Sequence, residues 1–203
     1  MYSTQPVFLE VSLNMVILIT GPKHSGKTLC AKALAKIIKA ETVDLDELIE
    51  KETGQTPREL YKESPEKFKK AEARALASLI NPPNPPECLV IAAGGGLIDN
   101  SEALALLTEP FVPPGRGEII TVYLEVSPET AWQRILYTAA GGELPPFLNT
   151  ENPAGNPEET HLVLHKRRAK AYKALAQLTI NAENKTPEKI AGEIAGSLGI
   201  NSK

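Results

Sequence analysis

More than any other feature, one octapeptide constrains the fold of this chain: residues 21–28, with the sequence GPKHSGKT. It fits the phosphate-binding pattern G-x-x-x-x-G-K-[ST]. An apolar run typical of a buried strand, residues 16–20, precedes it, and a helical pattern, residues 27–38, follows it. Because strand, loop and helix come in the order that a phosphate-binding loop requires, we discard the alternative of a chance match.

The rest of the chain continues this alternation of strand-like and helical segments. Five apolar runs have the length of buried strands: residues 16–20, 42–45, 89–93, 119–124 and 178–180. Helical patterns separate or follow them, at residues 27–38, 66–79, 101–107, 128–136, 158–175 and 187–198. Strands that alternate with helices form βα units, so we expect an α/β fold with a parallel sheet.

Length and charge limit the number of domains and the classes of partner. A chain of 203 residues suits one domain, which we expect at residues 15–203 after an N-terminal extension, residues 1–14. A net charge of −3 without a long basic run disfavours general binding to nucleic acid or to anionic membranes. Cys30 and Cys88 lack metal-ligand spacing, and the chain shows no signal-peptide pattern. We therefore expect a cytoplasmic monomer whose partners are small molecules.

The octapeptide predicts an ATP site. Amides of such a loop, together with the N-terminus of the following helix, attract polyphosphate. Lys27 should reach the β- and γ-phosphates, and the Thr28 hydroxyl should ligate Mg²⁺. His24, at the apex of the loop, could touch the nucleotide or face solvent, and solvent is favoured. The expected ATP contacts in this segment and directly after it are Gly21, His24, Ser25, Gly26, Lys27, Thr28 and Leu29.

Two carboxylates, Asp44 and Asp46, stand at the end of the second expected strand. Ligands of parallel sheets gather at the carboxyl ends of the strands, so both aspartates should face the same crevice as the octapeptide. Asp44 suits the Mg²⁺ shell. Asp46 suits an acceptor hydroxyl, which it could orient or deprotonate, and we assign it with Lys27 to catalysis. The alternative for either aspartate is a cap on the following helix.

Two further segments carry glycines where a ligand would lie. Gly94, Gly95 and Gly96 leave the third expected strand, and the absence of side chains there would allow a ligand to lie against backbone amides. A plain turn is the alternative. Residues 140–160 are polar and rich in glycine and proline, so they form either a mobile lid or a passive insertion. Their length favours the lid.

With these motifs in this order, the chain resembles the shikimate kinases from about residue 16 to residue 198. The similarity rests on the octapeptide, the three glycines, Arg134 and four short segments: VDLD at 43–46, FKKAE at 68–72, LEVSPE at 124–129 and RAKAY at 168–172. The resemblance implies a P-loop kinase fold with a five-stranded parallel sheet. It also implies ATP-dependent phosphorylation of shikimate at its 3-hydroxyl, with Mg²⁺, as a step in aromatic amino acid biosynthesis.

The resemblance further implies roles for individual residues. Asp46 would meet the hydroxyls of shikimate and Arg168 its carboxylate, while Arg134 and Pro187 would lie near the adenine. A guanidinium suits this role because it binds carboxylates through two parallel hydrogen bonds. The implied acceptor contacts are Asp46, Lys69, Gly94, Gly95, Gly96 and Arg168.

The sequence departs from the family pattern at three positions. His24 and Lys69 stand where the family usually has glycine and arginine, and Pro145 stands where the lid usually has arginine. Lys69 and Pro145 favour an alternative kinase that acts on another small hydroxy acid or a polyol. The missing lid arginine would also permit a nucleotide-binding regulatory domain without turnover.

Overall fold

The computed structural model describes residues 15–108, 118–139, 142–151 and 155–200. The expected N-terminal extension, residues 1–14, lies outside the described residues. So do residues 140–141 and 152–154 of the expected lid.

A five-stranded parallel sheet forms the centre of the molecule, in the order β2-β3-β1-β4-β5. Its strands are β1 (Met15–Thr20), β2 (Glu41–Asp44), β3 (Cys88–Ala92), β4 (Glu118–Glu125) and β5 (Leu178–Asn181). The five apolar runs predicted all of them to within one residue at each end. The α/β fold with a parallel sheet is thereby confirmed.

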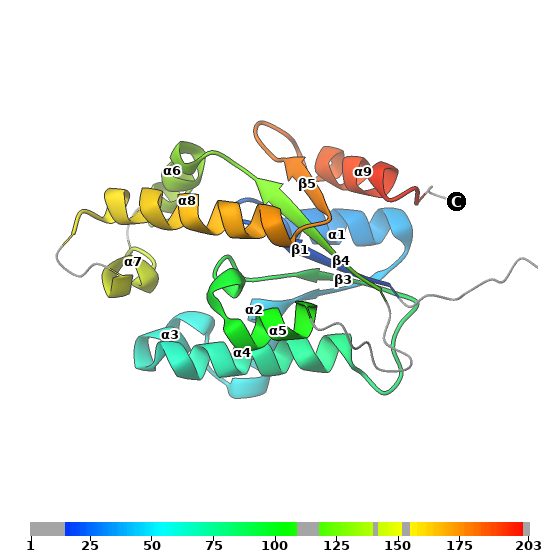
Figure 1. Cartoon of the computed structure of the whole chain (residues 1–203), viewed down its shortest axis with the longest axis horizontal. Helices are drawn as coiled ribbons and strands as arrows, with labels where there is room; N and C mark the ends of the chain where they lie inside the picture. The colour runs from blue at the N-terminus through cyan, green and yellow to red at the C-terminus, as the bar shows by residue number, and fades with distance from the viewer. Residues whose placement is uncertain (1–14, 109–117, 140–141, 152–154, 201–203) are drawn as a thin grey trace, which may run out of the picture.

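Helices cover both faces of the sheet because residues of the central strand alternate between the two faces. Ile17 and Ile19 of β1 pack beneath α1 (Lys27–Ile38) and α9 (Pro187–Ser197). Val16 and Leu18 face the other way and belong to a second core cluster. The helices on that side are α2 (Leu45–Thr53), α4 (Pro65–Ile80) and α5 (Ser101–Thr108) (Figure 1).

A third group of helices lies beyond the end of β4: α6 (Pro128–Ala139), α7 (Pro146–Glu151) and α8 (Pro157–Leu175) (Figure 1). Tyr172 of α8 stacks on Tyr123 of β4, with ring centroids 5.5 Å apart. A small apolar cluster joins the three helices through Trp132, Leu148 and Leu164. The two contacts position α7 and the segment before it beside the edge of the sheet where the strands end.

Several short elements were not predicted from periodicity. They are α2, α3 (Pro57–Glu63), the 3-10 helix η1 (Leu97–Asp99) and α7, which lies within the expected lid. Helix α2 follows β2 directly, so no loop separates the two patterns. Helix α3 owes its start to a capping box formed by Thr56 and Glu59, with Pro57 at its first position. Over the part of the chain that the structure describes, no helix combines the length and apolar character needed to cross a bilayer.

Candidate active site

The phosphate loop, residues 21–28, joins the end of β1 to the start of α1. Gly26 precedes α1 with a φ of 94°, a conformation that side chains rarely adopt. The Ser25 amide donates to the Pro22 carbonyl at 3.2 Å, and Lys27 Nζ donates to the same oxygen at 2.8 Å. Ser25 Oγ is buried and has no hydrogen-bond partner among the described residues. An anion at this helix N-terminus would find donors already gathered around it.

The charge of Lys27 depends on what the site holds. Burial lowers the pKa of its ammonium to about 8, and the carboxylates of Asp46 and Asp44 oppose this shift only in part. A polyphosphate beside Lys27 would favour the protonated form, because opposite charges at close range stabilise each other. Lys27 is therefore suited to bind phosphate groups rather than to stabilise the empty loop.

Thr28 and Asp44 meet at the base of the loop. Thr28 Oγ1 donates to Asp44 Oδ2 at 2.6 Å, and Asp44 Oδ1 accepts from the Asp46 amide at 3.0 Å. Asp44 therefore caps α2, which was the alternative to a metal role, and it also presents an oxygen beside Thr28. Hard oxygen donors suit Mg²⁺. Within the described ranges no three side chains of His, Cys, Asp or Glu are grouped so that they could hold a metal ion, so Mg²⁺ would need phosphate and water oxygens as well.

One cavity of about 550 Å³ connects the phosphate loop to the expected acceptor residues at the carboxyl ends of the strands. The expected residues that line it are His24, Gly26, Lys27, Thr28, Leu29, Asp44, Asp46, Gly94, Gly95, Gly96 and Arg168. The expected residues that do not line it are Gly21, Ser25, Lys69, Arg134 and Pro187. Segments far apart in the sequence therefore share one space large enough for a nucleotide phosphate tail and a small acceptor.

Asp46 lies between the two parts of this cavity. Desolvation by the surrounding protein raises the pKa of its carboxyl group, and so does the neighbouring Asp44 charge. The charges of Lys27 and Lys23 lower it in part. The side chain nevertheless remains open to solvent in the cavity. A carboxylate with a raised pKa accepts a proton more readily than an ordinary surface aspartate. Asp46 thus has both the access and the basicity that a general base requires.

The three glycines each leave room for a different neighbour. A Cβ atom on Gly94 would lie 3.0 Å from Glu72 Oε1, and one on Gly95 would lie 3.0 Å from the Lys23 amide nitrogen. A Cβ atom on Gly96 would lie 3.7 Å from Arg168 Nη2. The absence of side chains at this turn therefore allows the phosphate loop, a carboxylate and a guanidinium to approach the same stretch of backbone. That a ligand also lies against it stays a prediction.

Glu72 of α4 is a buried carboxylate that faces this glycine turn. Its side chain is 1% exposed, and Oε2 accepts a hydrogen bond from Asn100 Nδ2 at 2.9 Å. Within the described part of the chain, Oε1 has no hydrogen-bond partner. Burial raises the pKa of Glu72 to about 7, although the Asn100 hydrogen bond lowers it in part. The sequence places Glu72 in the FKKAE segment but does not show that it points inward.

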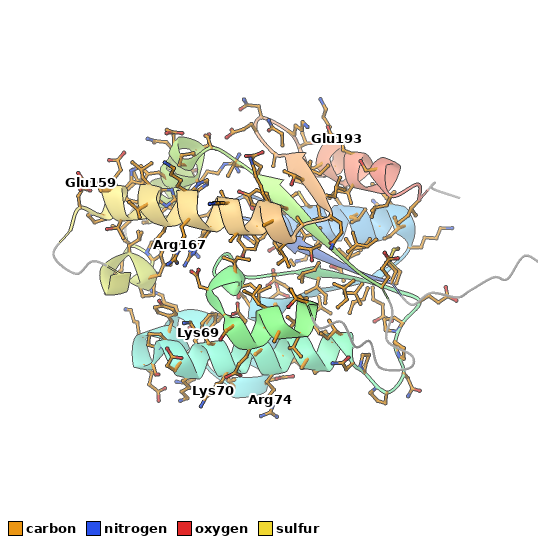
Figure 2. The ribbon with its side chains drawn as sticks, in the orientation of Figure 1. Lys69, Lys70, Arg74, Glu159, Arg167 and Glu193 are labelled. Atoms are coloured by element: carbon orange, nitrogen blue, oxygen red, sulfur yellow. The ribbon has the colours of Figure 1, made fainter. Side chains whose placement is uncertain are left out.

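Arg168 enters the cavity from α8 with its orientation fixed on two sides. Its Nε atom donates to Asp99 Oδ2 at 2.8 Å, and the Phe147 ring lies over the guanidinium at 5.0 Å from the ring centroid. Asp99 also accepts from Arg167 Nη2 at 2.9 Å, and Arg167 is labelled on α8 in Figure 2. The remaining edge of the guanidinium, Nη1 and Nη2, can face an anionic acceptor. Sequence spacing does not identify Asp99 or Phe147 as partners of Arg168.

His24 is only partly exposed, because its side chain lies between the cavity and α6. It has a φ of 60°, and its half-buried ring places Nε2 3.2 Å from Thr138 Oγ1 of α6. Arg134 Nη1 donates to the His24 carbonyl at 3.0 Å. Burial, with Lys23, Lys27 and Arg134 nearby, lowers the pKa of His24 to about 4. A neutral histidine thus joins the apex of the phosphate loop to α6.

Lys69 and Pro187 lie outside the cavity lining. Lys69 Nζ is 3.9 Å from Glu66 on the same helix, an ion pair that stabilises helices only slightly. In Figure 2, Lys70 and Arg74 point outward from α4. Pro187 occupies the first turn of α9, which packs on α1. The structure does not show whether Lys69 contacts an acceptor, nor whether Pro187 contacts an adenine. Both roles stay predictions.

Four residues of α3 and α4 complete the wall of the cavity opposite the phosphate loop: Pro57, Arg58, Tyr61 and Phe68. Phe68 opens the FKKAE segment, and its ring meets that of Tyr61 edge-on at 5.9 Å. Pro145, Pro146 and Phe147 of the lid also line the cavity. Sequence reasoning missed Arg58 because α3 is too short for its periodicity to be recognised.

Comparison with known proteins gives a consistent result. A family model described as "Shikimate kinase" matches residues 23–198. The shikimate kinase of Lactococcus lactis subsp. lactis is 29% identical over 187 residues, which cover 92% of this chain and 100% of the relative. The shikimate kinase of Persephonella marina is 31% identical over 183 residues, covering 90% and 98% of the two chains.

Solved structures agree with the sequence matches. Shikimate kinase from Acinetobacter baumannii in complex with shikimate superposes with a TM-score of 0.72 and 30% identity, over 93% of this chain and 95% of that one. Shikimate kinase from Aquifex aeolicus superposes with a TM-score of 0.63 and 26% identity, over 91% and 96% of the two chains. The family-model match, residues 23–198, includes all the residues that line the cavity.

Proposed function

The chain belongs to the shikimate kinase family, and we propose that it transfers the γ-phosphate of ATP to the 3-hydroxyl of shikimate. The observation that carries this proposal is the single cavity lined by both Lys27 of the phosphate loop and Arg168 of α8. The two ends of the cavity therefore carry charged groups that are complementary to a phosphoryl donor and to a carboxylate-bearing acceptor. Asp46 lies between them, where a hydroxyl would attack.

On the nucleotide side, the chain supplies charge and backbone donors. Lys27 would bind the β- and γ-phosphates, and its ammonium would exchange the Pro22 carbonyl for phosphate oxygens. The buried Ser25 hydroxyl and the loop amides would add hydrogen bonds. Phosphoryl transfer depends mainly on positioning and on neutralising charge, and these groups supply both.

We further propose that Mg²⁺ accompanies ATP, held by Thr28 and through the Asp44 carboxylate. The 2.6 Å contact between Thr28 Oγ1 and Asp44 Oδ2 supports this role, because it gathers two hard oxygen donors beside the loop. When bound, Mg²⁺ neutralises the charge of the phosphates. The other Asp44 oxygen, Oδ1, accepts a hydrogen bond from the Asp46 amide. The residue proposed to bind the metal would therefore also fix the backbone of the proposed base.

On the acceptor side, Asp46 would take the proton of the attacking hydroxyl. Its raised pKa and its access to the cavity support this role. Arg168 would bind the shikimate carboxylate through the Nη edge, because Nε is engaged by Asp99. Glu72 Oε1, which lies next to Gly94, would meet a hydroxyl of the acceptor.

The site residues of the sequence analysis that stand apart from the cavity keep their proposed roles. Arg134 contacts the loop apex through His24 and would lie near the adenine with Pro187. The net charge of −3, without a long basic run, supports a protein without nucleic acid or membrane partners. We propose that it acts in the cytoplasm as a monomer.

The test is ADP release by the purified chain with ATP and Mg²⁺, measured with shikimate and with a panel of other small hydroxy acids and polyols. We expect turnover to depend on shikimate and to fall by more than about tenfold with an acceptor that lacks the carboxylate, because Arg168 would lose its partner. Faster turnover of another acceptor would contradict the assignment of shikimate. ATP binding without turnover of any acceptor would favour a regulatory domain.

A further inference from the structure

The lid contributes no cation of its own to the cavity. Between Arg134 and Lys166 the sequence contains neither lysine nor arginine. The residues of this stretch that line the cavity are Pro145, Pro146 and Phe147, which are uncharged. The lid segment, defined here as residues 142–148, packs on Trp132 and Leu164 through its apolar side chains. A positively charged contact with this segment must therefore come from another element.

Arg58 of α3 makes that connection. Its Nη2 atom lies 3.0 Å from the carbonyl oxygens of both Glu143 and Leu144, and 3.1 Å from Glu143 Oε2. These are charge-assisted hydrogen bonds across 85 residues of sequence. Two of the three acceptors are backbone atoms directly before Pro145. Arg58 thus holds the lid backbone where the lid begins to cover the cavity.

The position of Arg58 on α3 indicates that its guanidinium serves the contact with the lid rather than the stability of its own helix. It is the second residue of α3, and a positive charge in the first turn is disfavoured by the helix dipole. Helix α3 therefore gains nothing from an arginine there. The capping box of Thr56 and Glu59 fixes the start of the helix, and buried Leu60 anchors it. The guanidinium is consequently presented to the lid from a firmly placed element.

Lys62, one turn later on α3, provides a natural comparison. Its Nζ atom contacts Glu143 Oε2 at 2.5 Å, but among the described residues it forms no hydrogen bond to the lid backbone, and it does not line the cavity. Both side chains of this ion pair are largely exposed, at 49% and 70%. Such pairs contribute little to stability. Lys62 thus shares the carboxylate with Arg58 but lacks the backbone contacts.

We propose that Arg58 is a positioning residue for phosphoryl transfer, which holds the lid segment closed over the acceptor side of the cavity. The proposal rests on the proposed function, because it assigns the lid to the same reaction. Arg58 acts through the Glu143 and Leu144 carbonyls, and closure excludes water from the transferred group. Since Arg58, Tyr61 and Phe68 also form the acceptor wall, binding of the acceptor and closure of the lid become coupled.

The test compares Arg58→Ala with Lys62→Ala. We expect Arg58→Ala to lower kcat by about tenfold or more while the KM for ATP changes less than about twofold, because closure and not nucleotide binding is lost. Lys62→Ala should change kcat less than about twofold. Arg58→Lys should recover part of the activity, since an ammonium can hold one carbonyl but lacks the planar fork.

Hydrogen exchange supplies a readout that does not depend on the acceptor. In the ligand-free protein, amides of the lid segment should exchange several-fold faster in Arg58→Ala than in Lys62→Ala. Equal exchange and equal kcat in the two variants would overturn the proposal. If the wild-type chain fails to phosphorylate shikimate, the proposed function fails, but faster exchange in Arg58→Ala still supports the positioning role.

Discussion

The two walls of the cavity are built in different ways. The nucleotide wall consists of residues 21–29 and Asp44. Its loop follows the central strand β1 directly, where Ile17, Leu18 and Ile19 are fully buried. The acceptor wall draws on α3, α4, η1, α8 and the lid segment. The ion pairs that Arg58 and Lys62 form with Glu143 of the lid have side chains that are 42% to 70% exposed. A donor site built on the buried core thus faces an acceptor site whose lid is held by one small apolar cluster and by exposed charged contacts.

The sharpest contrast should come from Lys27→Ala in the nucleotide wall. Lys27 contacts the Pro22 carbonyl and gains its main partner only when phosphate binds, so its removal should lower kcat by at least about 10³-fold. The melting temperature should change little, because burial of this ammonium without phosphate is unfavourable, as its lowered pKa indicates. Steady-state kinetics and thermal unfolding check the two parts. Turnover near the wild-type rate would remove the phosphate loop from the mechanism.

Asp46→Asn tests the boundary between the two walls. Loss of a general base should lower kcat by about 10²-fold, whereas ATP affinity should stay within about twofold of the wild type. The amide keeps the shape of the side chain, and the cap on α2 comes from Asp44 rather than from Asp46. Calorimetric titration with an ATP analogue and Mg²⁺ measures the affinity. A parallel loss of ATP affinity would move Asp46 to the nucleotide wall.

Glu72→Gln tests the acceptor wall through stability. The pKa of Glu72 is raised to about 7 from 4.5, so between these values the folded state keeps a proton that the unfolded state releases. The free energy of unfolding of the wild type should therefore fall as pH rises through this window. Glutamine lacks this proton equilibrium. The variant should be more stable than the wild type by about 2 kcal/mol above pH 7, and similar to it below pH 4.5.

Chemical denaturation at pH 4.5 and pH 8 gives the comparison for Glu72. Glu66→Gln, on an exposed position of the same helix, controls for the loss of one negative charge. A stability difference that is the same at both pH values would show that Glu72 is not protonated in the folded protein.

Lys69 should give the smallest effect. Its ammonium pairs with Glu66, and its side chain is 36% exposed. If it also reaches a carboxylate acceptor, Lys69→Arg should lower the KM for shikimate about twofold, because a guanidinium binds a carboxylate through two hydrogen bonds. Initial rates at varied shikimate concentration measure this change. An unchanged KM in both Lys69→Arg and Lys69→Ala would place Lys69 at the surface with no part in the acceptor wall.

The two walls also differ in how well the sequence predicts them. The nucleotide wall is contiguous in sequence, so the octapeptide and the flanking strand and helix identify Lys27 and Thr28 with their context. Asp44 follows from its place at the end of a strand. These inferences need only local spacing and the rule that ligands gather at the carboxyl ends of parallel strands.

The acceptor wall depends on contacts that spacing does not record. Asp99 and Phe147 fix Arg168 from separate elements, and Arg58 reaches the lid across the cavity. His24 was expected to face solvent, but the packing of α6 against the loop leaves its side chain only partly exposed. Short helices such as α3 are decided by caps and tertiary packing, which leave little periodicity to recognise.

The three glycines set different limits on redesign of the enzyme. A side chain at Gly95 would crowd the backbone of the phosphate loop, and one at Gly94 would crowd the buried Glu72 carboxylate, with Cβ atoms 3.0 Å from each. Gly96 has a φ of −105°, and the atom nearest to an added Cβ would be Arg168 Nη2 at an ordinary contact distance. A directed-evolution library at Gly96 could therefore reshape the acceptor pocket, while libraries at the other two glycines would yield mostly inactive protein.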